Sequence, residues 1–142
     1  MRRARAAAHN MVPTSTGAAI AAAQTIPQLH GKFDGMAVRV PVICGSLSDM
    51  VFLTEKNTNV EAINQVFEDA AEDPKYKNIL TVSKDPIVSN DIIGNIHSSI
   101  VDLPLTKVIG GDFVKVVAWY DNEWGYSNRM VETAILINNF DK

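Results

Sequence analysis

The succession of strand-like and helix-like segments is the feature that most constrains how this chain can fold. Five segments are rich in β-branched and aromatic residues, as strands are: residues 36–42, 49–55, 78–83, 98–103 and 113–120. Only three segments have helical patterns, and the two kinds do not alternate regularly. The sequence therefore predicts an α+β fold with a mixed or mostly antiparallel sheet and helices packed on one face. A chain of 142 residues holds one domain, or part of one.

The three predicted helices differ in how clearly their ends are marked. The clearest helix begins at the capping-box pair Thr58 and Glu61 and ends before Pro74. Residues 18–23 are an alanine-rich run that follows hydroxyl side chains, which are typical of a helix N-terminus. Residues 127–140 have an amphipathic helical pattern.

The composition argues against several classes of partner. The net charge of −3 argues against general nucleic-acid binding, for which a basic domain is expected. No apolar run reaches the roughly 18 residues that a membrane-spanning helix needs. The single cysteine, Cys44, excludes an internal disulfide and a zinc site made of several cysteines, and His9, His30 and His97 are too scattered for a local metal site. We therefore expect no nucleic acid, membrane or metal partner.

Charge is unevenly distributed along the chain. Residues 1–39 carry five Lys or Arg side chains and one Asp, whereas the remaining residues carry eight basic and fifteen acidic side chains. A basic stretch joined to an acidic body suggests that the N-terminal part binds an anion, although a solvated surface gives the same count. The first 33 residues contain no acid, a composition that a transit peptide shares with a folded segment.

Thr16, Gly17 and Arg39 are the best candidates for an anion site. The start of a helix offers unpaired backbone N–H groups, glycine allows close approach, and a threonine hydroxyl adds a donor. Arg39 is a cation within an otherwise apolar strand, and its planar guanidinium suits phosphate. The alternative is that Thr16 only caps the helix and Arg39 only faces solvent.

The turn at residues 121–126 is a second candidate for ligand contact. It follows the most apolar strand and opens the last helix, a common place for binding residues. Asn122 can both donate and accept hydrogen bonds, which suits recognition of an amide. The alternative is a capped turn with Trp124 and Tyr126 packed beneath it.

The sequence contains no complete catalytic set. Cys44 has no histidine nearby in sequence and no helix N-terminus after it, so nothing is expected to lower the pKa of its thiol. His97 is a candidate base, but a lone surface histidine is the simpler interpretation. A dinucleotide fingerprint, a phosphate loop and a serine elbow are all absent from the sequence.

Several motifs carry a resemblance to a known family. They are residues 2–8 (RRARAAA), 13–19 (PTSTGAA), 35–41 (GMAVRVP) and 119–129 (WYDNEWGYSNR), with further matches at 89–92 and 97–100. In order, and over nearly the whole chain, they resemble the phosphorylating glyceraldehyde-3-phosphate dehydrogenases from the middle of the catalytic domain to the C-terminus. Several long motifs at family spacing are far more specific than one short pattern.

The resemblance implies an activity and a set of binding residues. The family is a glycolytic, cytoplasmic homotetramer that uses NAD and inorganic phosphate to oxidise glyceraldehyde 3-phosphate to 1,3-bisphosphoglycerate, through a thiohemiacetal on a cysteine. Thr16, Gly17 and Arg39 fall on its phosphate-binding positions, and Arg3 falls on an arginine that also recognises substrate phosphate. Asn122 falls on the residue that holds the nicotinamide amide, and Tyr126 lies close to it.

The sequence also departs from the family. The motif Ser-Cys-Thr-Thr-Asn-Cys, which carries the nucleophile, and the histidine segment after it are absent, and Cys44 does not align with the nucleophile. The resemblance therefore assigns no catalytic residue to this chain, and we expect no dehydrogenase activity from it alone. Three alternatives are a sister enzyme acting on erythrose 4-phosphate, a non-catalytic association module, and a piece of a longer protein.

The resemblance divides the chain into two parts. Residues 1–124 correspond to part of the substrate-binding catalytic domain, beginning in the S-shaped loop at the tetramer interface. Residues 125–142 correspond to the C-terminal helix that packs on the NAD-binding Rossmann domain. Since that domain is missing, we expect the stripe formed by Met130, Ala134 and Ile137 to be exposed unless another chain or the N-terminal half covers it.

Overall fold

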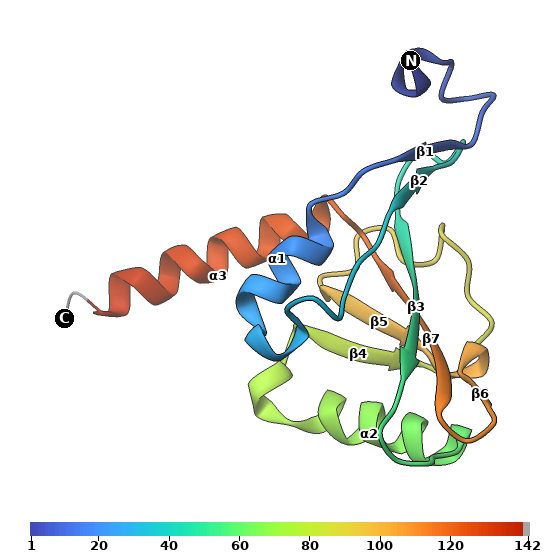
Figure 1. The fold of residues 1–142 in the computed structure, drawn as a ribbon. Helices are drawn as coiled ribbons and strands as arrows, with labels where there is room; N and C mark the ends of the chain where they lie inside the picture. The colour runs from blue at the N-terminus through green and yellow to red at the C-terminus, as the bar shows by residue number, and fades with distance from the viewer. Residues whose placement is uncertain (141–142) are drawn as a thin grey trace. The chain divides into compact units, whose positions relative to one another are not determined.

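The computed structural model describes residues 1–140, whose fold is drawn in Figure 1. The chain divides into two compact units, Met1–Ile43 and Cys44–Lys142. No helix within residues 1–140 combines the length and the apolar character needed to cross a membrane.

The N-terminal unit is built around a short pair of strands and one helix. Its elements are η1 (Arg2–Ala4), β1 (Val12–Thr14), α1 (Ala18–Thr25), η2 (Pro27–Leu29) and β2 (Ala37–Arg39). The antiparallel pairing of β1 with β2 sets Val12 opposite Arg39 and Thr14 opposite Ala37. The predicted helix at 18–23 is confirmed and extends to Thr25.

The strand predicted at 36–42 is much shorter than expected. Only Ala37–Arg39 forms β2, and Pro41, which has no backbone N–H, lies just beyond its end. The alternate apolar residues of this segment are exposed: Met36, Val38, Val40 and Val42. Its partner β1 was not expected, because three residues are too few to show a strand period.

The second unit contains a five-stranded sheet. Its strands are β3 (Ser46–Leu53), β4 (Leu80–Ser83), β5 (Ser99–Asp102), β6 (Lys107–Ile109) and β7 (Phe113–Tyr120). The order is β3–β7–β5–β4, with β6 also paired to β7. Only β4 and β5 run parallel. The prediction of a mixed, mostly antiparallel sheet in an α+β fold is therefore confirmed, although β6 was not expected and β3 begins three residues earlier than predicted.

The hydrophobic core lies between this sheet and α2 (Val60–Glu72). Its buried side chains come from β5, η4 (Leu103–Leu105) and β7: Val101, Leu103, Val114, Val116 and Ala118. Ile63 and Phe67 of α2 pack against them, one turn apart on the predicted apolar face. Helix α2 follows one face of the sheet in Figure 1.

The N-cap of α2 corrects one detail of the sequence analysis. The cap is Asn59, not Thr58, because the Asn59 Oδ1 accepts a hydrogen bond from the Ala62 N–H at 2.8 Å. Asparagine is at least as good a cap as threonine, since its short side chain reaches the same unpaired N–H groups. The helix ends at Glu72, just before Pro74, which begins η3 (Pro74–Tyr76).

Helix α3 (Trp124–Phe140) begins three residues before the predicted start. Arg129 fastens it to the sheet: its guanidinium donates to the Asn78 carbonyl and to the Ser98 hydroxyl, and forms an ion pair of 2.7 Å with Glu132. Several apolar side chains farther along α3 remain more than half exposed, namely Met130, Val131, Ile135, Leu136 and Ile137. The expected exposed stripe is therefore present.

Two valine substitutions test the placement of the core. Val101 is 1% exposed and Val66, on α2, is 62% exposed. We expect Val101→Ala to lower the free energy of unfolding by about 2 kcal/mol, because it removes buried methyl groups and leaves a cavity. Val66→Ala is the matched control and should change it by less than about 0.5 kcal/mol. Urea unfolding followed by circular dichroism measures both, and equal effects would contradict this core.

Candidate functional site

The strand pair of the N-terminal unit carries Arg39 and contacts Arg3, two of the four predicted phosphate-binding positions. Residues opposite each other in an antiparallel pair share a face, as do residues two apart on one strand. The pairing of Val12 with Arg39 and of Thr14 with Ala37 therefore puts the Thr14 and Arg39 side chains on the same face of the β1–β2 pair.

Arg3 is held against this face by two hydrogen bonds. Its Nε donates to the Thr14 hydroxyl at 2.6 Å, and its Nη2 donates to the Ser15 carbonyl at 3.4 Å. Both Arg3 and Arg39 are exposed, and neither forms an ion pair with an acid within residues 1–140. The two guanidinium groups therefore keep donors available for an anion.

The segment that Arg3 contacts leads directly into α1. Gly17 is the N-cap residue, and the Thr16 hydroxyl oxygen accepts a hydrogen bond from the Ala18 N–H at 3.1 Å. The Thr16 O–H proton remains available as a donor. A Cβ at Gly17 would meet no atom within 4 Å, so a ligand can approach the backbone there. No hydrogen bond in the described chain joins Arg39 to Thr16 or Gly17.

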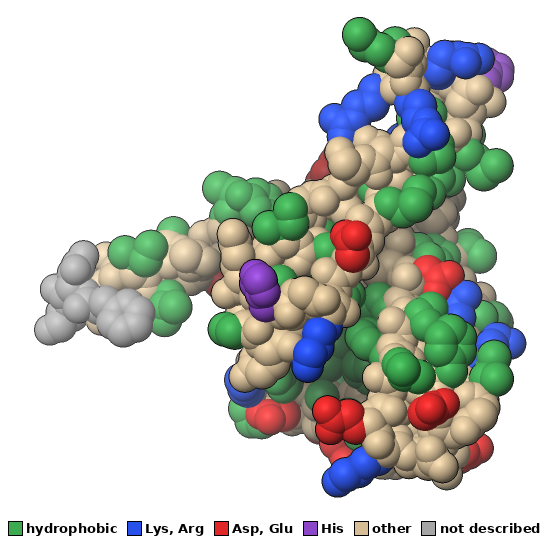
Figure 2. Space-filling model, in the orientation of Figure 1, with side chains coloured by type: hydrophobic (Ala, Val, Ile, Leu, Met, Phe, Trp, Pro, Cys, Tyr) green, Lys and Arg blue, Asp and Glu red, His purple; other side chains and the backbone are tan. Residues whose placement is uncertain are grey.

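Positive charge is concentrated around this strand pair. Figure 2 shows Lys and Arg side chains gathered over the N-terminal segment and the β1–β2 pair. Such a group of cations raises the local concentration of anions, so the unit as a whole favours a negatively charged ligand.

The turn after β7, in the second unit, is organised by Asp121. This carboxylate is 3% exposed and accepts hydrogen bonds from the N–H groups of Gly94 (2.8 Å), Glu123 (3.0 Å) and Trp124 (2.8 Å). Burial by itself would raise the pKa of Asp121, but the hydrogen bonds from Trp124, Gly94 and Glu123 outweigh it and hold the pKa below its ordinary value. Asp121 thus caps α3 and ties it to the loop at Gly94.

Asn122 and Tyr126 point outward from this turn. Both are exposed, and Tyr126 and Trp124 are not packed beneath the turn, since they are 67% and 52% exposed. The Asn122 Oδ1 accepts a hydrogen bond from the Ser46 hydroxyl at 3.1 Å. Its Nδ2 has no acceptor among residues 1–140, so this group can donate a hydrogen bond to a ligand.

Cys44 lies near the same turn but has no features of a nucleophile. Burial raises the pKa of its thiol, and the negative charges of Asp121 and Glu123 raise it further. A raised pKa keeps the sulfur protonated at neutral pH, whereas catalytic cysteines need the thiolate. This agrees with the expectation that nothing in the chain activates Cys44.

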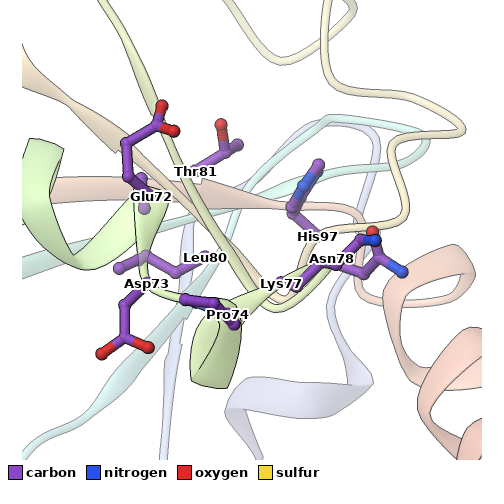
Figure 3. Close-up of a pocket in the computed structure, with 9 residues that line it drawn as sticks. Glu72, Asp73, Pro74, Lys77, Asn78, Leu80, Thr81 and His97 are labelled. Carbon is purple, nitrogen blue, oxygen red and sulfur yellow. The ribbon is translucent and has the colours of Figure 1, made fainter.

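His97 borders a separate open depression of about 410 Å³. Figure 3 shows His97 beside Asn78 on one side of it, with Glu72 and Asp73 on the other. The His97 Nδ1 lies 2.8 Å from the Asn95 Oδ1, and burial, together with the Arg129 charge, lowers the pKa of its imidazole. No cysteine or serine lines this depression; its hydroxyl and amine side chains are those of Thr81 and Lys77.

Asp121 and Ser46 are the functional residues that the sequence analysis did not single out. Asp121 lies three residues before the start of α3. An aspartate at such a place is a recognisable capping signal, because its carboxylate can accept hydrogen bonds from the first unpaired N–H groups of the helix. Ser46 has no such signal, because its role depends on a strand pairing with a residue far along the chain. Within residues 1–140 there is also no group of three or more His, Cys, Asp or Glu side chains that could hold a metal ion.

The second unit, a mixed sheet with α2 packed on it, has an α+β fold, and the N-terminal unit carries Arg3 and Arg39, which suit an anionic ligand. The sequence model for the C-terminal domain of glyceraldehyde 3-phosphate dehydrogenase matches residues 1–122. The chain therefore belongs to the glyceraldehyde-3-phosphate dehydrogenase family and corresponds to its C-terminal domain.

Individual relatives agree with this assignment. The chain is 49% identical over 139 residues to glyceraldehyde-3-phosphate dehydrogenase of Streptomyces coelicolor, covering 98% of this chain and 41% of the relative. It is 55% identical over 137 residues to glyceraldehyde-3-phosphate dehydrogenase 2 of Trichormus variabilis and to glyceraldehyde-3-phosphate dehydrogenase of Mycobacterium leprae, covering 96% of this chain and 40% of each relative. The chain thus spans about two fifths of the length of these relatives.

Replacing Asp121 tests its role as the cap of the turn. Asp121→Asn should lower the free energy of unfolding by about 1–3 kcal/mol at neutral pH, because the amide Nδ2 cannot accept a backbone N–H bond. A carboxyl with a lowered folded-state pKa stabilises the fold above its ordinary value of 3.8, and this contribution is lost as the pH falls through the lower folded-state value.

The difference between wild type and Asp121→Asn should therefore shrink as the pH falls below 3.8. Urea titrations over a series of pH values measure this. Asp85→Asn is the control, since the exposed Asp85 carboxylate accepts no hydrogen bond in the described structure. A difference that does not depend on pH would argue against a charged Asp121 cap.

Proposed function

We propose that this chain supplies the substrate-phosphate site of an NAD-dependent glyceraldehyde-3-phosphate dehydrogenase. The whole enzyme would oxidise glyceraldehyde 3-phosphate with NAD and inorganic phosphate to 1,3-bisphosphoglycerate, as a cytoplasmic glycolytic homotetramer. The main support is the attachment of Arg3 to Thr14 and Ser15, directly before the start of α1, on the face of the strand pair that carries Arg39.

The chemistry of these groups suits a phosphate monoester. Each guanidinium presents planar N–H donors that match two phosphate oxygens at once. The start of α1 adds backbone N–H groups and the positive end of the helix dipole, and the Thr16 hydroxyl adds one donor. Arg3, Thr16, Gly17 and Arg39 would together bind the phosphate of the substrate or the attacking inorganic phosphate.

Asn122 and Tyr126 are the residues of this chain that would contact NAD. Bound NAD would supply the hydride acceptor for the oxidation. The exposed Asn122 carboxamide, with its unpaired Nδ2, fits recognition of the amide on the nicotinamide ring. Tyr126, in the first turn of α3, offers an exposed aromatic ring four residues after Asn122.

Chemistry at the aldehyde carbon would depend on residues outside this sequence. Covalent catalysis needs a thiolate and a base that takes its proton, and the only cysteine here has a raised pKa. The chain therefore binds and orients substrate, and would be completed by the rest of the subunit. The exposed apolar side chains of α3 would be covered in that assembly.

Loss of Arg39 tests the phosphate site. We expect Arg39→Ala to weaken binding of inorganic phosphate by about 1.5–3 kcal/mol, the contribution of a charge-assisted hydrogen bond. Titration with phosphate, followed by the backbone amide resonances of Thr16 and Gly17, measures the affinity. Arg5→Ala is the control, since it removes the same charge from the same unit outside the proposed site. Equal weakening by both variants would mean that phosphate responds to the overall positive charge of the unit and not to a site that contains Arg39.

Catalysis by the isolated chain is the second test. We expect no NADH formation when the purified chain is mixed with glyceraldehyde 3-phosphate, NAD and phosphate, because no activated thiolate is present. Absorbance of NADH measures the rate, with a complete dehydrogenase as the positive control. Turnover at a rate comparable to that control would overturn the assignment of the chain as a binding part only.

A further inference from the structure

Ser46 and Asn122 meet where β3 begins and β7 ends. The register pairs Ser46 with Tyr120, the last residue of β7, and Asn122 lies two residues farther on. The Ser46 hydroxyl donates to the Asn122 Oδ1 at 3.1 Å. This bond uses one of the two lone pairs of the carboxamide oxygen, and the Nδ2 group has no acceptor among residues 1–140.

Both partners in this hydrogen bond have a fixed backbone. Gly45 has a φ of +90°, and a Cβ there would lie 3.0 Å from the Ile92 Cδ1 and 3.1 Å from the Ser89 carbonyl oxygen, so the residue before Ser46 must be glycine. On the other side, Asp121 is held by its three backbone donors. The position of the Ser46 hydroxyl relative to Asn122 is thus built into the fold.

We propose that Ser46 is a positioning residue that sets the orientation of the Asn122 carboxamide. With its Oδ1 held by Ser46, Asn122 would present Nδ2 to its ligand as a donor and would recognise the carbonyl oxygen of the nicotinamide amide. The identity of the ligand rests on the proposed function, whereas the orientation of the side chain does not.

The size of the effect follows from the strength of one hydrogen bond. A neutral hydrogen bond favours one geometry over the alternatives by a factor of roughly 2 to 12. Without the Ser46 hydroxyl, the exposed Asn122 side chain should therefore exchange among rotamers and amide orientations instead of keeping one.

Nuclear magnetic resonance of the isotopically labelled 142-residue chain tests the orientation directly. In wild type we expect a high order parameter for the Asn122 side-chain NH₂ group and a single χ1 rotamer. Ser46→Ala should lower the order parameter and average the rotamers, and Ser46→Thr should restore both by returning a hydroxyl. Ser48→Ala is the matched control, because Ser48 lies on the same face of β3 and makes no side-chain hydrogen bond in the described structure.

Two results would overturn the proposal. One is an Asn122 side chain that is equally ordered in wild type and Ser46→Ala. The other is a wild-type carboxamide turned so that its NH₂ protons, not its oxygen, face Ser46, which cross-relaxation with the Ser46 Hβ protons would reveal. The backbone resonances of Ser46→Ala are compared with those of Ser46→Thr, which keeps the hydroxyl. Changes far from Asn122 in Ser46→Ala alone would show that this variant disturbs the fold.

Two small probes separate this inference from the proposed function. Nicotinamide and 3-acetylpyridine share the carbonyl oxygen, but only nicotinamide has an NH₂ group. At millimolar concentration both should shift the Asn122 Nδ2 resonances with similar affinity, and Ser46→Ala should weaken both about two- to tenfold. A response to nicotinamide alone would overturn recognition of the carbonyl oxygen by Nδ2. A response to neither probe, with the wild-type orientation confirmed, would overturn the proposed cofactor contact and leave the role of Ser46 in place.

Discussion

Burial of the face of β7 that carries Val114, Val116 and Ala118 is the constraint on which the rest of the second unit depends. Val114, Val116 and Ala118 face the core beneath α2, while Val117 on the opposite face is only 4% exposed. The strand also pairs with β3, β5 and β6, so three other strands take their register from it. A shift of β7 by one residue would exchange its faces and break the core and all three pairings together.

The binding groups lie where these strands end, because the ends are where backbone N–H groups and polar side chains can reach solvent. Asp121, directly after β7, converts the last strand into the first turn of α3 and holds Asn122 at the surface. The N-terminal unit applies the same principle on a smaller scale. Its strand β1 leads through Thr14 and Ser15 into the start of α1, and Arg3 fastens that passage.

Sequence reasoning succeeded where a pattern spans enough residues to have a period. The strand at 113–120 and the helices at 18–25 and 60–72 were predicted nearly in full, because burial of one face or a marked cap defines them locally. Strands β1 and β6, of three residues each, are too short to show a strand period. Strand β1 exists through pairing with the distant β2, whereas β6 pairs with β7 across the Gly110–Gly111 turn, a hairpin signal that the sequence analysis did not use. Thr16, Gly17 and Asn122 could be nominated from their chemistry. The bonds that Arg3 makes to Thr14 and Ser46 makes to Asn122 could not, since they span 11 and 76 positions along the chain.

The single parallel pairing, between β4 and β5, has a consequence for how the chain folds. Parallel neighbours cannot be joined by a tight turn, so residues 84–98 must travel back along the sheet before β5 can pair. That excursion carries one deeply buried side chain, Ile92, and is closed by the Gly94 N–H bond to Asp121. Closing this loop costs chain entropy, and the contacts that β5 makes in the sheet form only after the loop has closed. The Asp121 turn therefore both closes this crossover and carries Asn122, the residue proposed to contact the cofactor.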